Sequence, residues 1–276
     1  MAAVTVPVTP PFGASLAPEP FLRRLRYGVS DSAALMKRNL THIYRVPALI
    51  VFTAIQPVMF TLLFRYVFGG AIHTNAGAYV NYLIPGIVIQ TAAFASVTTA
   101  IGLATELSQG VIDRFRSMPI ARSAVLLGRL GSDSLRILVT VIILLAVGYG
   151  VGFRINTGVG DTIAMIALSV GIGIAICCVS AWIGLSLKDP ESVQSFAFIW
   201  IFPITFASGV FVPVASMPAW LQDFARNNPV TLWASAARNL TISSPAGDSL
   251  WLSAVWIVGI IAVFGVLAVR AYRKAV

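Results

Sequence analysis

Charged residues are scarce in this chain. Asp, Glu, Lys and Arg make up 11% of its 276 residues, whereas a soluble domain carries about 25%. Hydrophobic residues account for 58% of the sequence, and the mean hydropathy is +0.87. Such a chain lacks the polar surface that a water-soluble domain needs, so its composition predicts an integral membrane protein.

Residues that perform chemistry are also scarce. His42 and His73 lie far apart in sequence and suggest neither a metal site nor a catalytic arrangement with Ser or Cys. Cys177 and Cys178 are adjacent inside an apolar run and resemble small core residues. A phosphate-binding P-loop needs Lys directly after Gly, and no lysine of the chain follows a glycine. We therefore predict no enzyme activity, no metal, no cofactor and no motor within this chain.

The first 20 residues contain no basic residue and no apolar run of the length found in a signal peptide. They are rich in proline, and we predict a disordered cytoplasmic tail at 1–20. Residues 21–46 are predicted to be an interfacial helix region, because Met36, Leu40 and Ile43 follow helical spacing. A merely basic linker is the alternative. Residues 47–276 are predicted to form the transmembrane domain.

Six apolar segments are long enough, at about 20 residues each, to cross the hydrocarbon core of a bilayer as helices. They cover residues 47–68, 79–104, 135–153, 162–187, 193–212 and 250–269. The predicted fold is therefore all-α, with six transmembrane helices. Pro57, Pro85 and Pro203 should kink their helices locally, which bundles tolerate when neighbouring helices satisfy the freed carbonyls.

The basic residues are distributed unevenly around these segments. All 19 except Arg65, Arg154, Arg226 and Arg238 fall on the side that holds both termini. The positive-inside rule then places both termini and the 104–134 loop in the cytoplasm, in a multi-pass protein of the cell membrane. The same rule accounts for the net charge of +9, so a nucleic-acid partner is not predicted.

Charge is sparse inside the spans as well. Arg65 and Arg136 lie near the ends of their segments, where long side chains reach the interface. Glu106, Asp113 and Asp133 are all predicted at the cytoplasmic rim. Because an ion-coupled carrier keeps an ionisable group inside the membrane, a self-powered secondary transporter is disfavoured.

The 213–245 segment, between the fifth and sixth spans, is broken by prolines and is too short to cross the membrane. Two short outer helices are predicted there. They either dip into the outer leaflet or cap a cavity. Alternatively, Trp220 and Trp233, like Trp251, are ordinary interfacial aromatics. The sequence leaves both interpretations open.

The loop between the second and third spans concentrates charge. On a helix, Val111, Phe115 and Met118 form one apolar stripe, with Asp113 and Arg116 roughly opposite. Such a helix fits a groove in a partner protein, and it also fits the lipid headgroups. Periodicity alone does not choose between them. Because the chain has no phosphate-binding P-loop of its own, we predict that a separate, energy-supplying partner acts on the chain through this loop.

Five stretches carry a family resemblance: RNLTHIYRVPALIVFTAIQPVMFTLLFRYVFGG, YVNYLIPGIVIQTAAF, ELSQGVIDRFRSMPI, LLGRLGSDSLR and SGVFVPVASMPAWLQDFARNNPVT. In this order they resemble the daunorubicin-resistance type permeases of the ABC-2 transporter family. The resemblance runs from about Arg38 to Arg273. It implies the membrane half of an exporter, paired with a cytoplasmic ATP-binding subunit and with a second permease, identical or paralogous. ATP and Mg would bind to the ATP-binding partner.

The resemblance also implies site residues. The ATPase-coupling helix would consist of Glu106, Gly110, Val111, Asp113, Arg114, Phe115, Arg116, Met118 and Pro119. A substrate path between the second and fifth spans would use Thr91, Phe94, Phe198, Phe202 and Phe206. The last three recur every four residues, a spacing that also fits plain helix packing.

Together these features predict a permease that exports a hydrophobic or amphipathic compound, a drug or a lipid, because the path lacks charge. It would work by alternating between inward and outward access, in contact with membrane lipid. The alternatives are a lipid-linked polysaccharide exporter on the same scaffold and a non-transporting membrane scaffold that recruits a cytoplasmic partner.

Overall fold

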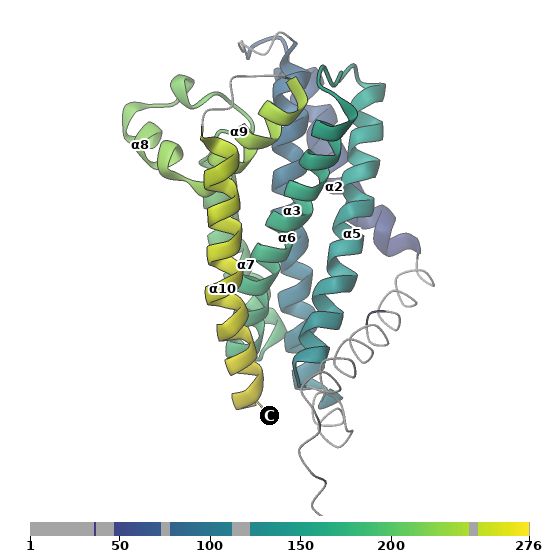
Figure 1. Cartoon of the computed structure of the whole chain (residues 1–276), viewed down its shortest axis with the longest axis vertical. Helices are drawn as coiled ribbons and strands as arrows, with labels where there is room; N and C mark the ends of the chain where they lie inside the picture. Colours follow the sequence, from purple (N-terminus) through teal and green to yellow (C-terminus); the bar gives the residue numbers. More distant parts are fainter. Residues whose placement is uncertain (1–35, 37–46, 73–77, 112–121, 243–247, 276) are drawn as a thin grey trace, which may run out of the picture.

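The computed structural model describes Met36 and residues 47–72, 78–111, 122–242 and 248–275 (Figure 1). Every regular element in these ranges is helical, which confirms the predicted all-α class. In chain order they are α2 (Pro47–Leu63), the π-helical turn η1 (Phe64–Phe68), α3 (Tyr79–Ser108), α5 (Arg122–Gly150), α6 (Val159–Leu187), α7 (Pro190–Phe206), the 3₁₀ turn η2 (Val214–Ser216), α8 (Ala219–Asn227), α9 (Pro229–Ile242) and α10 (Ser249–Ala275). The predicted tail at 1–20 lies outside these ranges, as does the 21–46 region apart from the helical Met36.

Four helical segments are long and apolar enough to cross a membrane: Tyr79–Ser108, Val125–Gly150, Val159–Leu187 and Ser249–Lys274. They correspond to the second, third, fourth and sixth predicted spans. The α2 and α7 helices have 17 residues each, or about 26 Å at 1.5 Å per residue. This is short of the about 30 Å of the hydrocarbon core. The count of six spans therefore stays a prediction.

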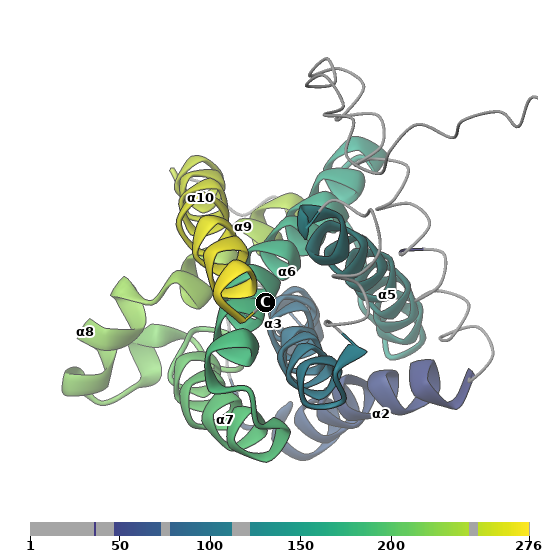
Figure 2. The same ribbon diagram turned by 90° about the horizontal axis from the view of Figure 1, so that it is seen from below.

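The centre of the bundle is α3. Viewed end-on, it lies beside α6, with α2, α5, α7 and α10 around the two (Figure 2). In α3, 78% of the most apolar stretch is buried, whereas in α10 only 11% of that stretch is buried. Helix α10 therefore lies at the periphery of the bundle with its apolar side chains outward. The α8 and α9 helices gather at the end of the bundle where α10 begins, and the C-terminus lies at the opposite end (Figure 1).

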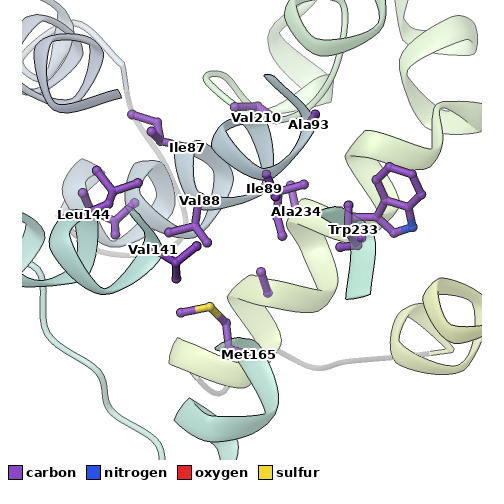
Figure 3. Packing of buried hydrophobic residues seen from close by; sticks show 14 of the residues in the cluster. Ile87, Val88, Ile89, Ala93, Val141, Leu144, Met165, Val210, Trp233 and Ala234 are labelled. Atoms are coloured by element: carbon purple, nitrogen blue, oxygen red, sulfur yellow. The ribbon is translucent and has the colours of Figure 1, made fainter. Parts of the chain in front are cut away.

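Small residues let α3 and α6 approach closely. A Cβ atom on Gly184 of α6 would overlap the carbonyl oxygen of Ala100 of α3. Such close contacts are typical of membrane helices, which gain from van der Waals packing because lipid gives them no hydrophobic drive to associate. The main hydrophobic cluster then brings together Val88 of α3, Val141 of α5 and Met165 of α6 (Figure 3).

The fifth predicted span ends earlier than its apolar sequence suggests. The apolar run continues to residue 212, but α7 ends at Phe206. Asn228 donates from Nδ2 to the carbonyls of Ile204 and Ala207, at 2.7 and 3.2 Å. These bonds satisfy acceptors that an ending helix leaves unpaired, so the chain turns away from the helix here.

Arg238 of α9 holds the segment that follows α7. It is buried, and its guanidinium donates to the carbonyls of Gly209 and Val210, at 2.7 and 2.9 Å. A third bond reaches the Tyr82 carbonyl of α3 at 2.9 Å, and the guanidinium lies 3.5 Å from the centre of the Tyr82 ring. The residue therefore ties α9 and the 207–212 segment to α3 through charge-assisted hydrogen bonds.

Two short helices form between α7 and α10, as predicted. The tryptophans of this region differ in environment: Trp233 of α9 is buried in the main cluster, whereas Trp220 and Trp251 are 76% and 71% exposed. Trp233 is therefore a core residue. The exposure of the other two suits aromatic side chains at a membrane interface.

A tight turn joins α6 to α7. Lys188 adopts a left-handed conformation with φ of +63°, and Asp189 caps α7 by accepting a hydrogen bond from the Ser192 amide at 2.8 Å. Hydrogen bonds from Ser192 hold the pKa of the exposed Asp189 carboxyl below its ordinary value. Pro190 begins the helix, where its missing N–H costs nothing.

Candidate functional site

A pocket of about 270 Å³ lies between α2 and α3. It is lined by Thr53, Gln56, Pro57 and Phe60 of α2 and by Gln90, Thr91, Phe94, Ala95 and Thr98 of α3. None of these described lining residues is ionisable, and the walls combine two aromatic rings with amide and hydroxyl groups. This cavity, the α2–α3 pocket, suits an uncharged ligand of mixed polarity. It contains Thr91 and Phe94, two of the predicted substrate-path residues.

The pocket lies deep along α3. Gln90 is about 16 Å along the helix from Tyr79, its first residue, in a helix of 30 residues that is about 45 Å long. The hydroxyls of Thr91 and Thr98 donate to carbonyls of their own helix, at 2.7 and 2.8 Å, as is common in apolar helices. Toward a ligand they therefore offer lone pairs and no hydrogen.

Gln90 differs from these threonines. It is 3% exposed, and its Nε2 atom has no hydrogen-bond partner among the described residues. A buried amide donor left unpaired costs about 1–3 kcal/mol. Sequence reasoning missed it, although a glutamine that interrupts the apolar run of the second predicted span was a usable signal.

A row of phenylalanine rings runs beside the pocket. Phe94 meets Phe202 of α7 edge to face, with ring centroids 5.2 Å apart. Phe202 neighbours Phe198 at 5.5 Å and stacks on Phe206 at 5.3 Å. Phe206 then meets Phe60 of α2 at 6.0 Å. The structure thus brings the predicted path residues of α3 and α7 together, and adds Phe60, which sequence reasoning missed.

The rings of α7 in this row are partly exposed. Phe198, Phe202 and Phe206 are 37%, 39% and 38% exposed. Phe202 and Phe206 contact Phe94 and Phe60, the two rings that line the pocket. Their role in the passage of a substrate stays a prediction.

The predicted coupling helix is described only at its beginning. Glu106, Gly110 and Val111 are described, whereas Asp113, Arg114, Phe115, Arg116, Met118 and Pro119 lie outside the described residues. Helix α3 continues to Ser108, beyond the predicted end of its span at residue 104. Gly110 has a φ of +66°, and Val111 packs against a hydrophobic cluster at this end of the bundle. The coupling role stays a prediction.

Glu106 belongs to a group of charges between α3 and α5. Arg129 Nη1 lies 3.6 Å from Glu106 Oε1, and Arg129 Nε lies 3.4 Å from Asp133 Oδ2. Arg136 donates to Asp133 Oδ1 at 2.9 Å, and Thr99 donates to Asp133 Oδ2 at 2.6 Å. Among the described residues, the group contains the two carboxylates of Glu106 and Asp133 and the two guanidinium groups of Arg129 and Arg136.

The structure adds to the sequence-based expectation at two residues of this group. Asp133 is predicted at the cytoplasmic rim and Arg136 within reach of the interface; in the structure Asp133 is 4% exposed and the two side chains are paired. Helix α5 begins at Arg122, well before residue 135, the predicted start of the third span. The position of both residues at the rim stays a prediction. Because Asp133 is a buried charge, the earlier argument against a secondary carrier, that the chain buries no charge, no longer holds. The argument against an ion-coupling role for Asp133 is instead that both of its carboxylate oxygens are already paired.

The same arginines bond to the backbone of residues that line the pocket. Arg129 donates to the carbonyl of Thr98 at 3.1 Å, and Arg136 donates to the carbonyl of Ala95 at 3.0 Å. Thr98 and Ala95 both line the α2–α3 pocket. One polar network therefore connects the pocket wall to the two helices that flank the predicted coupling loop.

Comparisons with known proteins agree with this architecture. Residues 32–242 match the family model described as ABC-2 type transporter. The chain is 30% identical over 249 residues, 88% of each chain, to the daunorubicin resistance ABC transporter permease protein DrrB1 of Streptomyces coeruleorubidus. It is 27% identical over 253 residues, 91% of each chain, to the probable doxorubicin resistance ABC transporter permease protein DrrC of Mycobacterium tuberculosis. The putative transport permease ycf38 of Pyropia yezoensis is 24% identical over 218 residues, 77% of this chain and 74% of that protein.

Proposed function

Because the chain belongs to the ABC-2 type transporter family, we propose that it is the permease subunit of an ABC exporter for a hydrophobic or amphipathic compound. A separate ATP-binding subunit supplies the energy and binds ATP and Mg. The observation that carries the proposal is the α2–α3 pocket, which has no ionisable group among its described lining residues and adjoins a half-exposed row of aromatic rings. The drug-resistance names of the relatives support the same class of cargo.

The proposal includes six spans, with α2 plus η1 as the first and α7 as the fifth. Both termini then lie in the cytoplasm, as the distribution of basic residues favours. The 112–121 loop lies on the same side, where a cytoplasmic ATPase binds. A second permease, identical or paralogous, completes the membrane part of the transporter.

The coupling mechanism that we propose uses the network between α3 and α5. Arg129 and Asp133 of α5 contact Glu106 and Thr99 of α3, and so join the two helices that flank the 112–121 loop. Arg129 and Arg136 also hold the carbonyls of Thr98 and Ala95 in the pocket wall. A push on the loop therefore moves α3 and α5 as a unit and reshapes the pocket between α2 and α3. Switching between two such packings is a conformational mechanism and needs no covalent chemistry in this chain.

Co-purification with an ABC ATPase subunit from the same genome tests this function. We expect the wild-type chain to bind the ATPase. The Phe115→Asp variant should not bind it, because the substitution places a charge in the apolar stripe of the predicted coupling helix. Phe224→Asp, at an exposed phenylalanine of α8, is the matched control and should bind normally. The chain alone should hydrolyse no ATP, and a neutral quinone should raise the turnover of the complex.

Two outcomes would contradict parts of this proposal. Full association of the Phe115→Asp variant with the ATPase would refute the coupling assignment. If the ATPase binds the chain but no tested compound changes its ATP turnover, the result would favour the non-transporting scaffold.

A lipid-linked polysaccharide is a second candidate cargo. The half-exposed rings of Phe198, Phe202 and Phe206 are aromatic platforms of the kind along which a sugar chain passes. The described lining of the pocket favours the first candidate, because it carries no carboxylate to bind sugar hydroxyls. Stimulation of ATP turnover by a lipid-linked oligosaccharide, and none by a quinone, would reverse this preference.

A further inference from the structure

A glycine of α3 lies directly beneath the arginine that bridges α3 and α5. A Cβ atom on Gly102 would overlap Arg129 Nη2 and would lie 2.7 and 2.9 Å from Cζ and Nη1 of the same side chain. The three nearest described atoms thus belong to one guanidinium group, which rests against the backbone of α3. A Cβ atom on Gly86 or Gly184 would instead meet a backbone carbonyl, so those two glycines serve the close packing of chain segments.

The hydrogen bond of Arg129 to α3 explains why the space at position 102 has to be empty. In an α-helix the carbonyl of Thr98 bonds to the amide of Gly102, and a Cα–Cβ bond tilts toward the N-terminus, over the preceding turn. A side chain at position 102 would therefore stand over the Thr98 carbonyl. Arg129 donates to this carbonyl at 3.1 Å, and a residue without a Cβ atom leaves it open.

The same guanidinium reaches the charged end of this helix face. Thr98, Gly102 and Glu106 recur every four residues, so they form one row along α3, about 12 Å long. Arg129 Nη1 lies 3.6 Å from Glu106 Oε1 at one end of the row, and Nη2 is bonded to Thr98 at the other. Thr98 lines the α2–α3 pocket, and Glu106 lies in the last turn of α3, before the 112–121 loop. One side chain of α5 therefore holds both the pocket wall and the end of α3 that leads into the loop.

A methyl group at position 102 would displace this arginine rather than the helices. The guanidinium is the far end of a flexible side chain that is 19% exposed, so it can move aside, whereas the Ala100 carbonyl that faces Gly184 is backbone. Alanine also favours a helix more than glycine does. Gly102→Ala should therefore leave folding intact and remove the contacts of Arg129 with α3.

From these contacts we infer that Gly102 is a positioning residue for coupling between the ATPase and the transport path. It leaves the space in which Arg129 lies against α3, so that α3 and α5 move together when the 112–121 loop is pushed. This inference rests on the proposed function. It assigns Gly102 no contact with the substrate or with the ATPase, because Gly102 acts through Arg129.

The position of the two helices is tested first on the full chain without its ATPase. Ser108→Cys and Leu127→Cys, at exposed positions of α3 and α5, carry spin labels in lipid nanodiscs, and electron paramagnetic resonance measures the distribution of distances between the labels. Cys177 and Cys178 are buried, and both are changed to alanine in every sample. Helices that move as a unit give one narrow distribution.

Gly102→Ala should broaden this distribution, because Arg129 no longer holds α3. Arg129→Met, which removes the guanidinium and keeps the glycine, should broaden it to the same extent. In the double variant the second substitution should add nothing, since the two residues act as one unit. Gly265→Ala, on α10 where a Cβ atom meets no described atom within 4 Å, is the matched control and should keep the distribution narrow. Gly102→Ser, which also adds a Cβ atom, replaces the alanine variant if that variant does not fold.

The same substitutions are then compared in vesicles that contain the ATPase, with a fluorescent amphipathic quinone as the probe. The quantity measured is the amount of quinone transported per ATP hydrolysed. Gly102→Ala and Arg129→Met should each lower this ratio by about fivefold or more, the lower end of the coupling between distant sites in proteins, and the double variant should lower it no further. A purely structural role would lower the unfolding temperature and both rates together, and would leave their ratio unchanged.

Three results would overturn the inference. They are a narrow distance distribution in Gly102→Ala, effects of the two single variants that add in the double variant, and an unchanged ratio of transport to ATP hydrolysis in Gly102→Ala. Failure of the proposed function has a different signature. A wild-type chain that never transports in the presence of the ATPase would refute that function, while the distance measurement on the chain alone still decides whether Gly102 positions Arg129.

Discussion

The charges buried between α3 and α5 allow a stability prediction with a definite magnitude. Asp133 is bonded to Arg136 at 2.9 Å and to Thr99 at 2.6 Å. The side chains of Asp133 and Arg136 are 6% and 13% exposed, so water screens the pair poorly. Removing one partner of a buried ion pair costs about 3–5 kcal/mol, whereas replacing both with apolar residues is often neutral or stabilising.

We therefore expect Asp133→Leu to lower the free energy of unfolding by about 3–5 kcal/mol, because Arg136 is left buried without a carboxylate. Adding Arg136→Met to this variant should recover most of the loss. Asp223→Leu, at an exposed position of α8, is the control and should change the free energy by no more than about 0.5 kcal/mol. Reversible unfolding in mixed micelles, analysed as a double-mutant cycle, measures all three.

The reasoning is refuted if the losses from Asp133→Leu and Arg136→Met simply add in the double variant. It is also refuted if Asp133→Leu is no more harmful than the exposed control. Either result would mean that the two side chains do not depend on each other in the folded protein, and that this buried pair of α5 is not an energetically coupled unit.

Three further changes have defined outcomes. Gly184→Ala should cost about 1–3 kcal/mol in the same assay, because its Cβ would overlap the Ala100 carbonyl, whereas Gly259→Ala, in open space, should not destabilise. Arg238→Met should speed amide hydrogen exchange over residues 207–213, because the carbonyls that the guanidinium holds lose their donor. Phe202→Ala should slow transport but leave ATPase binding intact. Unchanged stability, unchanged exchange or full transport, respectively, would contradict each assignment.

Hydropathy and charge were sufficient to predict the helical membrane class. A long apolar run in lipid has to satisfy its own backbone groups, and a helix does so locally. The details that failed depend on residues distant in sequence. Helix α7 ends at Phe206 because Asn228 bonds its last carbonyls, and Asp133 is buried because α3 supplies Thr99 to face it. Neither contact leaves a periodic pattern in the sequence.

The candidate site was predictable only in part, because some of its features depend on residues that are distant in sequence. The spacing of Phe198, Phe202 and Phe206 placed three rings on one face of α7, where the structure has them as a row. The sequence also marks Gln90 as polar. What it does not reveal is that no described neighbour pairs with the amide, because this depends on how α2 packs on α3. The coupling residues beyond Val111 remain a prediction from resemblance.

ATP-dependent transport in reconstituted vesicles tests the central claim most directly. The chain is incorporated with its ATPase partner into vesicles, and the accumulation of a fluorescent amphipathic quinone is followed over time. The account predicts accumulation only with both subunits and ATP, and no loss of transport when the proton gradient is dissipated. Transport by the chain alone, or transport that collapses with the gradient while ATP persists, would contradict it.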